Sequence, residues 1–182
     1  MIFDPFARNH LIRDSICRAI YERMQADPTV YLMGEGAHMK VHFDAPDIER
    51  DFRDRVITLP ISEDGNSNFA VGMAVAGLTP IVDVISSDFL FRTMDAIANT
   101  MCKQARIAKP RTIVVRSEFF GDGPTSGQRV ENIFRQVPGL RVVIPENPRQ
   151  AYMDMLAALT RKEITLFFED RNLPDSSFEG AA

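Results

Sequence analysis

Hydrophobic positions fall into two kinds of segment, which alternate along the chain. Stretches with apolar residues three or four positions apart predict helices at 12–24, 66–78, 90–105, 128–136 and 149–159. Between the helices lie short apolar runs typical of buried strands, at 30–33, 55–59, 81–85, 112–115, 141–144 and 164–168. Asp27-Pro28 ends the first helix, and Asp88 is a candidate cap for the helix at 90–105.

This alternation predicts an α/β fold, a three-layer α/β/α arrangement with a mainly parallel sheet of about six strands. Strands that are apolar on both faces and alternate with helices are typical of a parallel sheet covered on both sides. Residues 35–54 are polar and irregular, so we expect a long loop there that contributes nothing to the core. Because ligands of such folds bind outside the carboxyl ends of the strands, the candidate loops are 34–54, 60–66, 86–89 and 117–127.

Length and composition narrow the class of protein. A chain of 182 residues predicts one domain over 1–182, with its core at 11–170 and a polar tail at 171–182. The net charge of −4 disfavours a nucleic-acid partner, which requires a basic surface. The longest apolar stretch, 69–78, is too short to span a bilayer, and the N-terminus lacks the apolar run of a signal peptide. We therefore expect a cytoplasmic protein with no membrane partner.

One loop carries a carboxylate where an α/β fold presents its ligands. The segment LPISEDG, residues 59–65, follows a predicted strand and leads into a helix rich in small residues, so Glu63 is well placed to meet a ligand. In the alternative interpretation Ser62 caps that helix and Glu63 lies in its first turn, where the helix dipole favours an acid. The local pattern by itself favours the structural role.

Several segments, in order along the chain, point to one family. They read DPTVYLMGE, LPISEDG, VGMAVAGLTPIVDV, SDFLFRTMDAIAN, GPTSGQ, VPGLRVVIPENPRQA and ITLFFED. From residue 11 to about residue 170 the chain resembles the pyrimidine-binding domain of thiamine-diphosphate enzymes. It is most similar to the β subunit of 2-oxoacid dehydrogenase E1 components and more distantly to transketolases. The resemblance implies an enzyme subunit that uses thiamine diphosphate for 2-oxoacid decarboxylation or for ketol or acyl transfer.

The resemblance also implies the site residues. Glu63 is the catalytic acid, whose protonated carboxyl donates to N1′ of the aminopyrimidine so that the 4′-imino group can take the proton from thiazolium C2. Phe89 stands where the family stacks an aromatic ring on the pyrimidine, and Ile61 touches the same ring. Glu35 and Arg92 match further positions near the cofactor. From the residues alone, Phe89 is equally a core side chain, Glu35 a solvated loop acid, and Arg92 an exposed helix residue.

Ser126 departs from the family pattern. Family members commonly read GPTHSQ, with a histidine that faces the substrate, whereas residues 123–128 here read GPTSGQ. A hydroxyl, which does not titrate near neutrality, replaces an imidazole that does. Either the substrate differs, as in a transketolase-like or acyloin-forming carboligation, or a partner supplies the missing group.

The resemblance implies a second subunit. The family's Mg²⁺ and diphosphate are held by another domain, which we expect on an α-type partner in an α2β2 assembly. The GDG at 121–123 lacks the Asn pair that completes the diphosphate motif, so we interpret it as a loop. His38 and His42 lack a third ligand, and we predict no metal site on this chain. Cys102 lies on an apolar stripe and is expected in the core. A non-catalytic regulatory or scaffolding subunit that keeps the fold and interface is the alternative.

Overall fold

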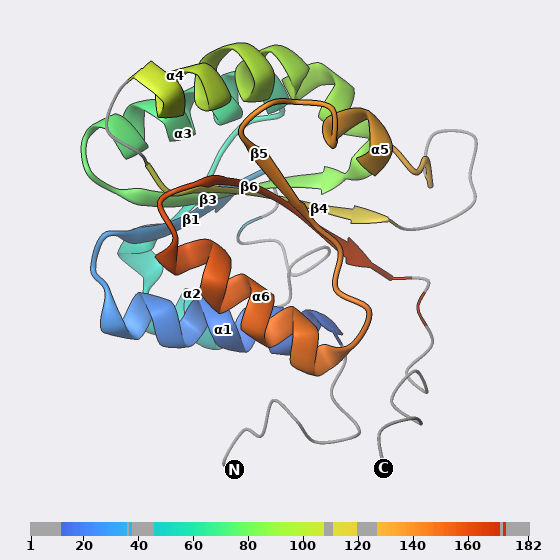
Figure 1. The fold of residues 1–182 in the computed structure, drawn as a ribbon. Coiled ribbons are helices and arrows are strands. Elements are labelled where there is room, and N and C mark those ends of the chain that lie inside the picture. Colours follow the sequence, from blue (N-terminus) through green and yellow to red (C-terminus); the bar gives the residue numbers. More distant parts are fainter. Residues whose placement is uncertain are drawn as a thin grey trace.

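The computed structural model describes residues 12–35, 37, 46–107, 111–119, 127–171 and 173. Its centre is a six-stranded sheet in the order β2-β1-β3-β4-β6-β5, in which every neighbouring pair is parallel (Figure 1). The strands are β1 (Val30–Gly34), β2 (Val56–Thr58), β3 (Thr79–Ser86), β4 (Ile113–Phe119), β5 (Leu140–Val143) and β6 (Ile164–Asp170). Each overlaps the apolar run that predicted it, and the α/β fold is confirmed.

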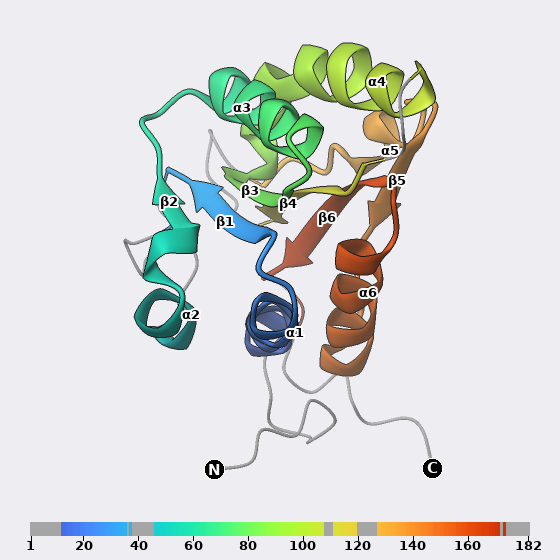
Figure 2. The ribbon, with the colours of Figure 1, turned by 90° about the vertical axis from the view of Figure 1, so that its left-hand side faces the viewer.

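Helices cover both faces of the sheet (Figures 1 and 2). On one face lie α1 (Ile12–Ala26), α2 (Pro46–Asp51) and α6 (Pro148–Thr160), and on the other lie α3 (Glu63–Val75), α4 (Cys102–Ile107) and α5 (Glu131–Phe134). Shorter pieces among the described residues are the 3₁₀ helices η1 (Arg53–Arg55) and η2 (Ser87–Thr93) and the π-helix η3 (Ala96–Met101). None of these helices is both long and apolar enough to span a bilayer.

Each face of the sheet has its own hydrophobic core. Against α1 and α6, side chains such as Ile16, Ile20 and Met155 are fully buried. On the opposite face, the rings of Phe119 and Phe168 stack with their centroids 4.4 Å apart. Burying one side chain of this size contributes about 1.5–3 kcal/mol, so a strand that serves both cores carries apolar residues on both of its faces.

Two predicted segments differ from the structure. Residues 35–54 were expected to contribute nothing to the core, but α2 and η1 lie there, and Ile48 of α2 is only 2% exposed and packs in the core. A six-residue helix that buries one large side chain has too few positions to show a periodic pattern. The helix expected at 128–136 is the single turn α5, and the one expected at 66–78 begins already at Glu63.

The stretch expected as one helix at 90–105 is divided among η2, η3 and α4. Cys102 is buried in the core, as predicted. Burial raises the pKa of its thiol to about 11, so at neutral pH the group is a protonated, poor nucleophile.

The connections between strands create two crevices at the carboxyl edge of the sheet. The chain leaves β1 toward α2 on one face and leaves β3 toward η2 on the other, so the loops separate above the neighbouring strands β1 and β3. The same separation recurs at β6, because β4 leads to α5 on one face and β5 leads to α6 on the other. Points where the connections diverge are where open α/β sheets bind ligands.

Candidate active site

Glu63 lies at the first of these crevices. It follows β2 by a four-residue turn and is the first residue of α3, and it is 7% exposed. The side-chain amide of Asn66 donates to the carbonyl of Pro60 at 3.0 Å, which holds the turn against the helix. Ser62 is the N-cap residue of α3 and Glu63 lies in its first turn, as the alternative interpretation predicted, but the Ser62 hydroxyl makes no capping hydrogen bond.

The backbone amide of Ser62 has a hydrogen-bond partner in Glu35. The amide of Ser62 donates to Oε1 of Glu35 at 3.0 Å, so the residue after β1 holds the start of α3. Partial burial, followed by the negative charges of Glu63 and Asp83, raises the pKa of Glu35, and the hydrogen bond from Ser62 only partly offsets this. Glu35 and Glu63 therefore form a pair of neighbouring acids.

Arg92 contacts one member of this pair, Glu63, from η2. Its Nε donates to Oε2 of Glu63 at 3.1 Å, while 73% of its side chain is exposed. The guanidinium has no other hydrogen-bond or ion-pair partner among the residues that the structure describes. Glu63 thus has a neighbouring acid in Glu35 and an exposed counter-ion in Arg92.

The end of β3 is irregular where it leads into η2. A shift of register lies between Asp83 and Ser86, and Ile85 adopts φ 35°, a left-handed conformation that costs a β-branched residue free energy. Ser86 caps η2, since its Oγ lies 3.4 Å from the amide of Asp88 and donates to the Asp88 carboxylate at 2.9 Å. The prediction that Asp88 is the cap is therefore wrong by two positions.

Two apolar side chains flank this group of charges. Phe89 of η2 is 37% exposed, and Ile61 in the turn before α3 is 82% exposed. The ion pair between Arg92 and Glu63 brings η2 and the start of α3 together, so both side chains belong to one surface region. Phe89 is therefore not a buried core residue, and the alternative that it is a core side chain is wrong.

The remaining predicted positions lie outside the described residues. They are Ser126, the GDG at 121–123, and the two histidines at 38 and 42. One contributor was missed by sequence reasoning, namely Asp83, which is 2% exposed and pairs in register with Gly34 just before Glu35. A lone acid within the apolar run at 81–85 was the available signal.

The site thus contains the nearly buried carboxyl group of Glu63 and, on the same surface, exposed apolar side chains. A second acid, Glu35, and the exposed guanidinium of Arg92 lie next to it. In such an arrangement the carboxyl group can form a hydrogen bond with a nitrogen of a planar heterocycle that packs on Phe89 and Ile61. The observed residues therefore suit an aminopyrimidine ring.

The fold and this site define the class of protein, an α/β cofactor-binding domain. Residues 10–175 match the family described as "Transketolase, pyrimidine binding domain". The chain belongs to this family, as the resemblance predicted.

Similar proteins agree with that assignment. The chain is 31% identical over 189 residues to pyruvate dehydrogenase E1 component subunit beta-2, mitochondrial, of Oryza sativa subsp. japonica, covering 97% of this chain and 49% of that protein. It is 32% identical over 132 residues to 2-oxoisovalerate dehydrogenase subunit beta, mitochondrial, of Dictyostelium discoideum, covering 69% of this chain and 36% of that protein. The chain thus spans half or less of the length of these relatives.

Solved structures share the fold at lower identity. A split gene transketolase, described as an inactive β4 tetramer, superposes with a TM-score of 0.75 at 17% identity, over 88% of this chain and 51% of that one. A transketolase from Leishmania mexicana gives a TM-score of 0.69 at 17% identity, over 87% of this chain and 25% of that one.

Proposed function

We propose that this chain is the pyrimidine-domain subunit of a split thiamine-diphosphate enzyme that decarboxylates a 2-oxoacid or transfers a ketol or acyl group. The observation that carries the proposal is the position of Glu63, nearly buried at the start of α3 with two exposed apolar side chains beside it. Family membership and the E1 β relatives support it. Thiamine diphosphate, when bound, supplies the carbanion chemistry at C2.

Glu63 is the proposed catalytic residue. Its role is to hold a proton at the carboxyl oxygen and share it with N1′ of the pyrimidine ring. Exclusion of water matters here, because a nearly buried carboxyl can bond to the ring nitrogen with little competition from solvent. The neighbouring acid is Glu35, whose own pKa is raised by its partial burial and by the charge of Glu63.

The other proposed cofactor residues orient the ring. Phe89 offers an aromatic face for stacking, and Ile61 offers aliphatic contact from the turn before α3. Glu35 keeps that turn in place through the amide of Ser62. Arg92 contributes a counter-ion that must release Glu63 when the acid is protonated.

A partner subunit of the α type is part of the proposal, with Mg²⁺ and the diphosphate held mainly by that partner in an α2β2 assembly. Exposed apolar side chains on the two elements that carry the site support such an interface: Phe69 and Val75 on α3 and Phe91 on η2 are 51%, 57% and 44% exposed. Gly72, between the two α3 side chains, has nothing within 4 Å of where a Cβ would be, so its own chain does not require a glycine there.

The substrate class is a 2-oxoacid or a ketose, with Ser126 on the proposed substrate side. A hydroxyl can donate to a substrate oxygen but cannot relay a proton near neutrality as a histidine does. Replacing Ser126 by His should therefore favour 2-oxoacid decarboxylation in the assembled complex if this position selects the substrate.

The proposal is tested by the exchange of the cofactor's C2 hydrogen, measured by NMR in the complex with an α-type subunit. Glu63→Gln cannot donate an acidic proton, and we expect exchange to slow by roughly 10²–10⁴-fold, the range of a lost general acid–base group. Glu63→Asp, which keeps an acid on a shorter arm, should retain part of the rate. Parental exchange in Glu63→Gln, with cofactor bound, would instead indicate the non-catalytic subunit.

A further inference from the structure

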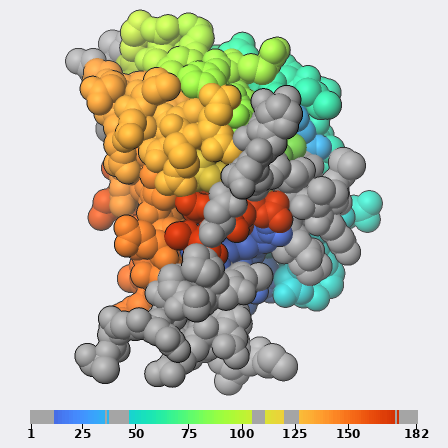
Figure 3. Space-filling model, turned by 90° about the vertical axis from the view of Figure 1, so that its right-hand side faces the viewer, coloured from blue at the N-terminus to red at the C-terminus, as the bar shows by residue number. Residues whose placement is uncertain are grey.

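The second crevice of the sheet contains a cavity that the proposed cofactor site does not use. It lies at the carboxyl ends of β5 and β6 and has a volume of about 520 Å³, within the range of small-molecule sites. In Figure 3, which looks onto this edge, the surface of the segments after β4 and β5 (orange) borders the end of β6 (red). Four strands lie between β2, which leads to Glu63, and β5.

One wall of the cavity is fixed by Arg129. Its Nη1 donates to Asp170 at the end of β6 at 2.5 Å, its Nε donates to Glu131 at 3.1 Å, and its guanidinium lies 4.0 Å from the centre of the Phe119 ring. Partial burial lowers the pKa of Arg129, but the hydrogen bonds and charges of Asp170 and Glu131 outweigh it and raise the pKa overall. This side chain is held in place and its charge is already balanced.

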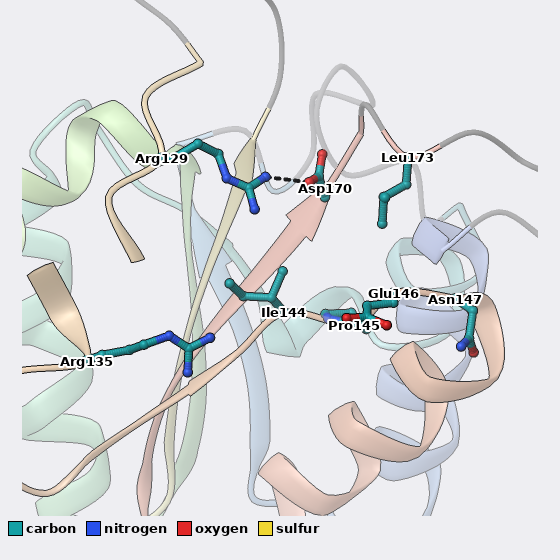
Figure 4. A pocket seen from close by; sticks show the side chains of 8 residues that line it. All are labelled: Arg129, Arg135, Ile144, Pro145, Glu146, Asn147, Asp170 and Leu173. Atoms are coloured by element: carbon teal, nitrogen blue, oxygen red, sulfur yellow. Dashed lines mark hydrogen bonds and ion pairs between the residues drawn. The ribbon is translucent and has the colours of Figure 1, made fainter. Parts of the chain in front are cut away.

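Arg135, which directly follows α5, is a cation of the cavity that no described acid compensates. Figure 4 shows its guanidinium directed toward Ile144, on the same side as Arg129 and facing the segment that carries Asn147. It has no hydrogen-bond or ion-pair partner in the described part of the chain. A guanidinium in this state binds a carboxylate or phosphate through two parallel hydrogen bonds.

The opposite wall is the connection from β5 to α6. Asn147 caps α6, with its Oδ1 accepting from the amide of Gln150 at 2.8 Å, so its Nδ2 is left as a donor. Ile144 and Pro145 supply an apolar floor, and Glu146 is an acceptor at the rim. The cavity thus combines donors for an acid group with room for a body that carries both carbon and hydroxyl groups.

We propose that this cavity binds a small hydroxylated acid, whose phosphate or carboxylate group is held by Arg135. The placement follows from the topology, because the connections after β4 and β5 diverge here as those after β1 and β3 do at the cofactor crevice. The inference does not depend on the cofactor site or on its chemistry.

The test uses the ¹⁵N-labelled chain titrated with glycerol 3-phosphate, with glycerate, and with uncharged glycerol. One of the two acids should bind saturably and shift the amide signals of 127–135, 144–150 and 170–171, and the stronger acid identifies the group recognised. Glycerol should shift none of them. Arg135→Gln should weaken binding roughly tenfold or more, the loss expected for charge-assisted hydrogen bonds.

Arg53→Gln is the matched control, since Arg53 is an exposed arginine of η1, before β2, and lacks any side-chain partner among described residues. This variant should bind the acid with an affinity within about twofold of the parent's. Arg53 does not line the cavity, so its charge acts on the ligand only through solvent and salt, which screen it. Three results would overturn the proposal. They are equal weakening of binding by the two substitutions, amide shifts centred on 35 and 61–66, and no saturable binding of either acid. Thermal unfolding of both variants should match the parent, because neither side chain has a partner to lose among the residues that the structure describes.

Discussion

Glu63 combines two opposing demands on one carboxyl group. The proposed proton relay needs the carboxyl to donate a hydrogen bond, whereas Nε of Arg92 donates one to its Oε2 at 3.1 Å. The contact is a single hydrogen bond from a side chain that is 73% exposed, so screening by water keeps it weak. Release of Arg92 therefore costs little, as the proposed approach of a cofactor ring requires.

We expect Arg92→Gln to speed the exchange of the C2 hydrogen in the assembled complex by about two- to fivefold, the kinetic equivalent of an exposed ion pair. Arg92→Lys keeps the charge and should stay near the parental rate. Exchange followed by NMR distinguishes the two variants. A slower rate in Arg92→Gln would mean that the guanidinium binds the cofactor and does not oppose the relay.

Glu35 gives a prediction that needs no cofactor. Its pKa is raised in the folded chain, so the folded state binds this proton more tightly than the unfolded state. That stabilisation is complete below the ordinary value of 4.5 and is lost as pH rises through the raised value, which leaves an ionised Glu35 as a cost at neutral pH.

Glu35→Gln removes the charge and keeps an oxygen acceptor for the Ser62 amide. At pH 7 its thermal unfolding midpoint should lie about 1–2 °C above that of the parent, the effect of roughly half a kcal/mol after solvent screening. The difference should disappear near pH 4, where the parental carboxyl is protonated too. A constant difference across this pH range would contradict the assigned cause.

At the scale of the element, α3 shows how backbone conformation decides the effect of a glycine. Gly72 lies inside the helix and Gly77 follows its end, and a Cβ at either position would meet nothing within 4 Å. They differ in backbone, since Gly77 has φ 95° and terminates the helix in the left-handed region. Contacts within the chain therefore cannot account for either glycine.

Gly72→Ala should stabilise the isolated chain by about 0.5–1 kcal/mol, because alanine loses less conformational entropy in a helix. Gly77→Ala should destabilise it by about 1 kcal/mol, because alanine is strained at positive φ. Urea unfolding of both variants measures the two signs. If a partner packs on this face of α3, Gly72→Ala should also weaken its binding, which sedimentation of the mixture would reveal.

The irregular stretch after β3 shows where local pattern fails. Apolar spacing over 90–105 predicted one helix, yet the chain passes through a 3₁₀ helix, a π-helix and a short α-helix. The three helix types differ only slightly in the number of residues per turn, and each can keep apolar residues on one face. The spacing of apolar residues therefore cannot distinguish them. The difference matters, because η2 is what exposes Phe89 and carries Arg92 to Glu63.

At the scale of the molecule, a cluster of charges buried inside the sheet joins three of its strands. Arg116 of β4 is fully buried and donates to Asp83 of β3 at 2.7 Å, to Glu118 at 2.8 Å and to Glu169 of β6. Arg13 and Arg171 each pair with one of these acids at 3.2 Å. Three arginines thus balance three carboxylates, which is how charges survive away from water.

Arg116→Met should destabilise the chain by about 3–5 kcal/mol at pH 7, because it leaves buried carboxylates uncompensated. Desolvation, together with Glu169 and Asp83, already raises the pKa of Glu118, and losing the arginine raises it further. The deficit should therefore shrink toward pH 4, as the acids become protonated. Urea unfolding at both pH values measures it, and adding Glu118→Gln should recover part of the loss at pH 7.

The sequence by itself determined the class of fold and the place of the main acid. Runs that are apolar throughout can be buried only in a sheet covered on both faces, so their alternation with helices implied parallel strands. Glu63, directly after one such run, was thereby assigned to the ligand-binding edge. Both conclusions use information that lies within a few residues along the chain.

Only the tertiary structure decided which groups meet. The contacts of Glu35 with Ser62, Glu63 with Arg92, and Arg129 with Asp170 join residues 27, 29 and 41 positions apart. Parallel strands return to the same edge only after crossing over a face, so each such pair depends on strand order and register. The local spacing of residues along the chain specifies neither strand order nor register. The second crevice exists because β6 lies between β4 and β5, and this follows only from the strand order.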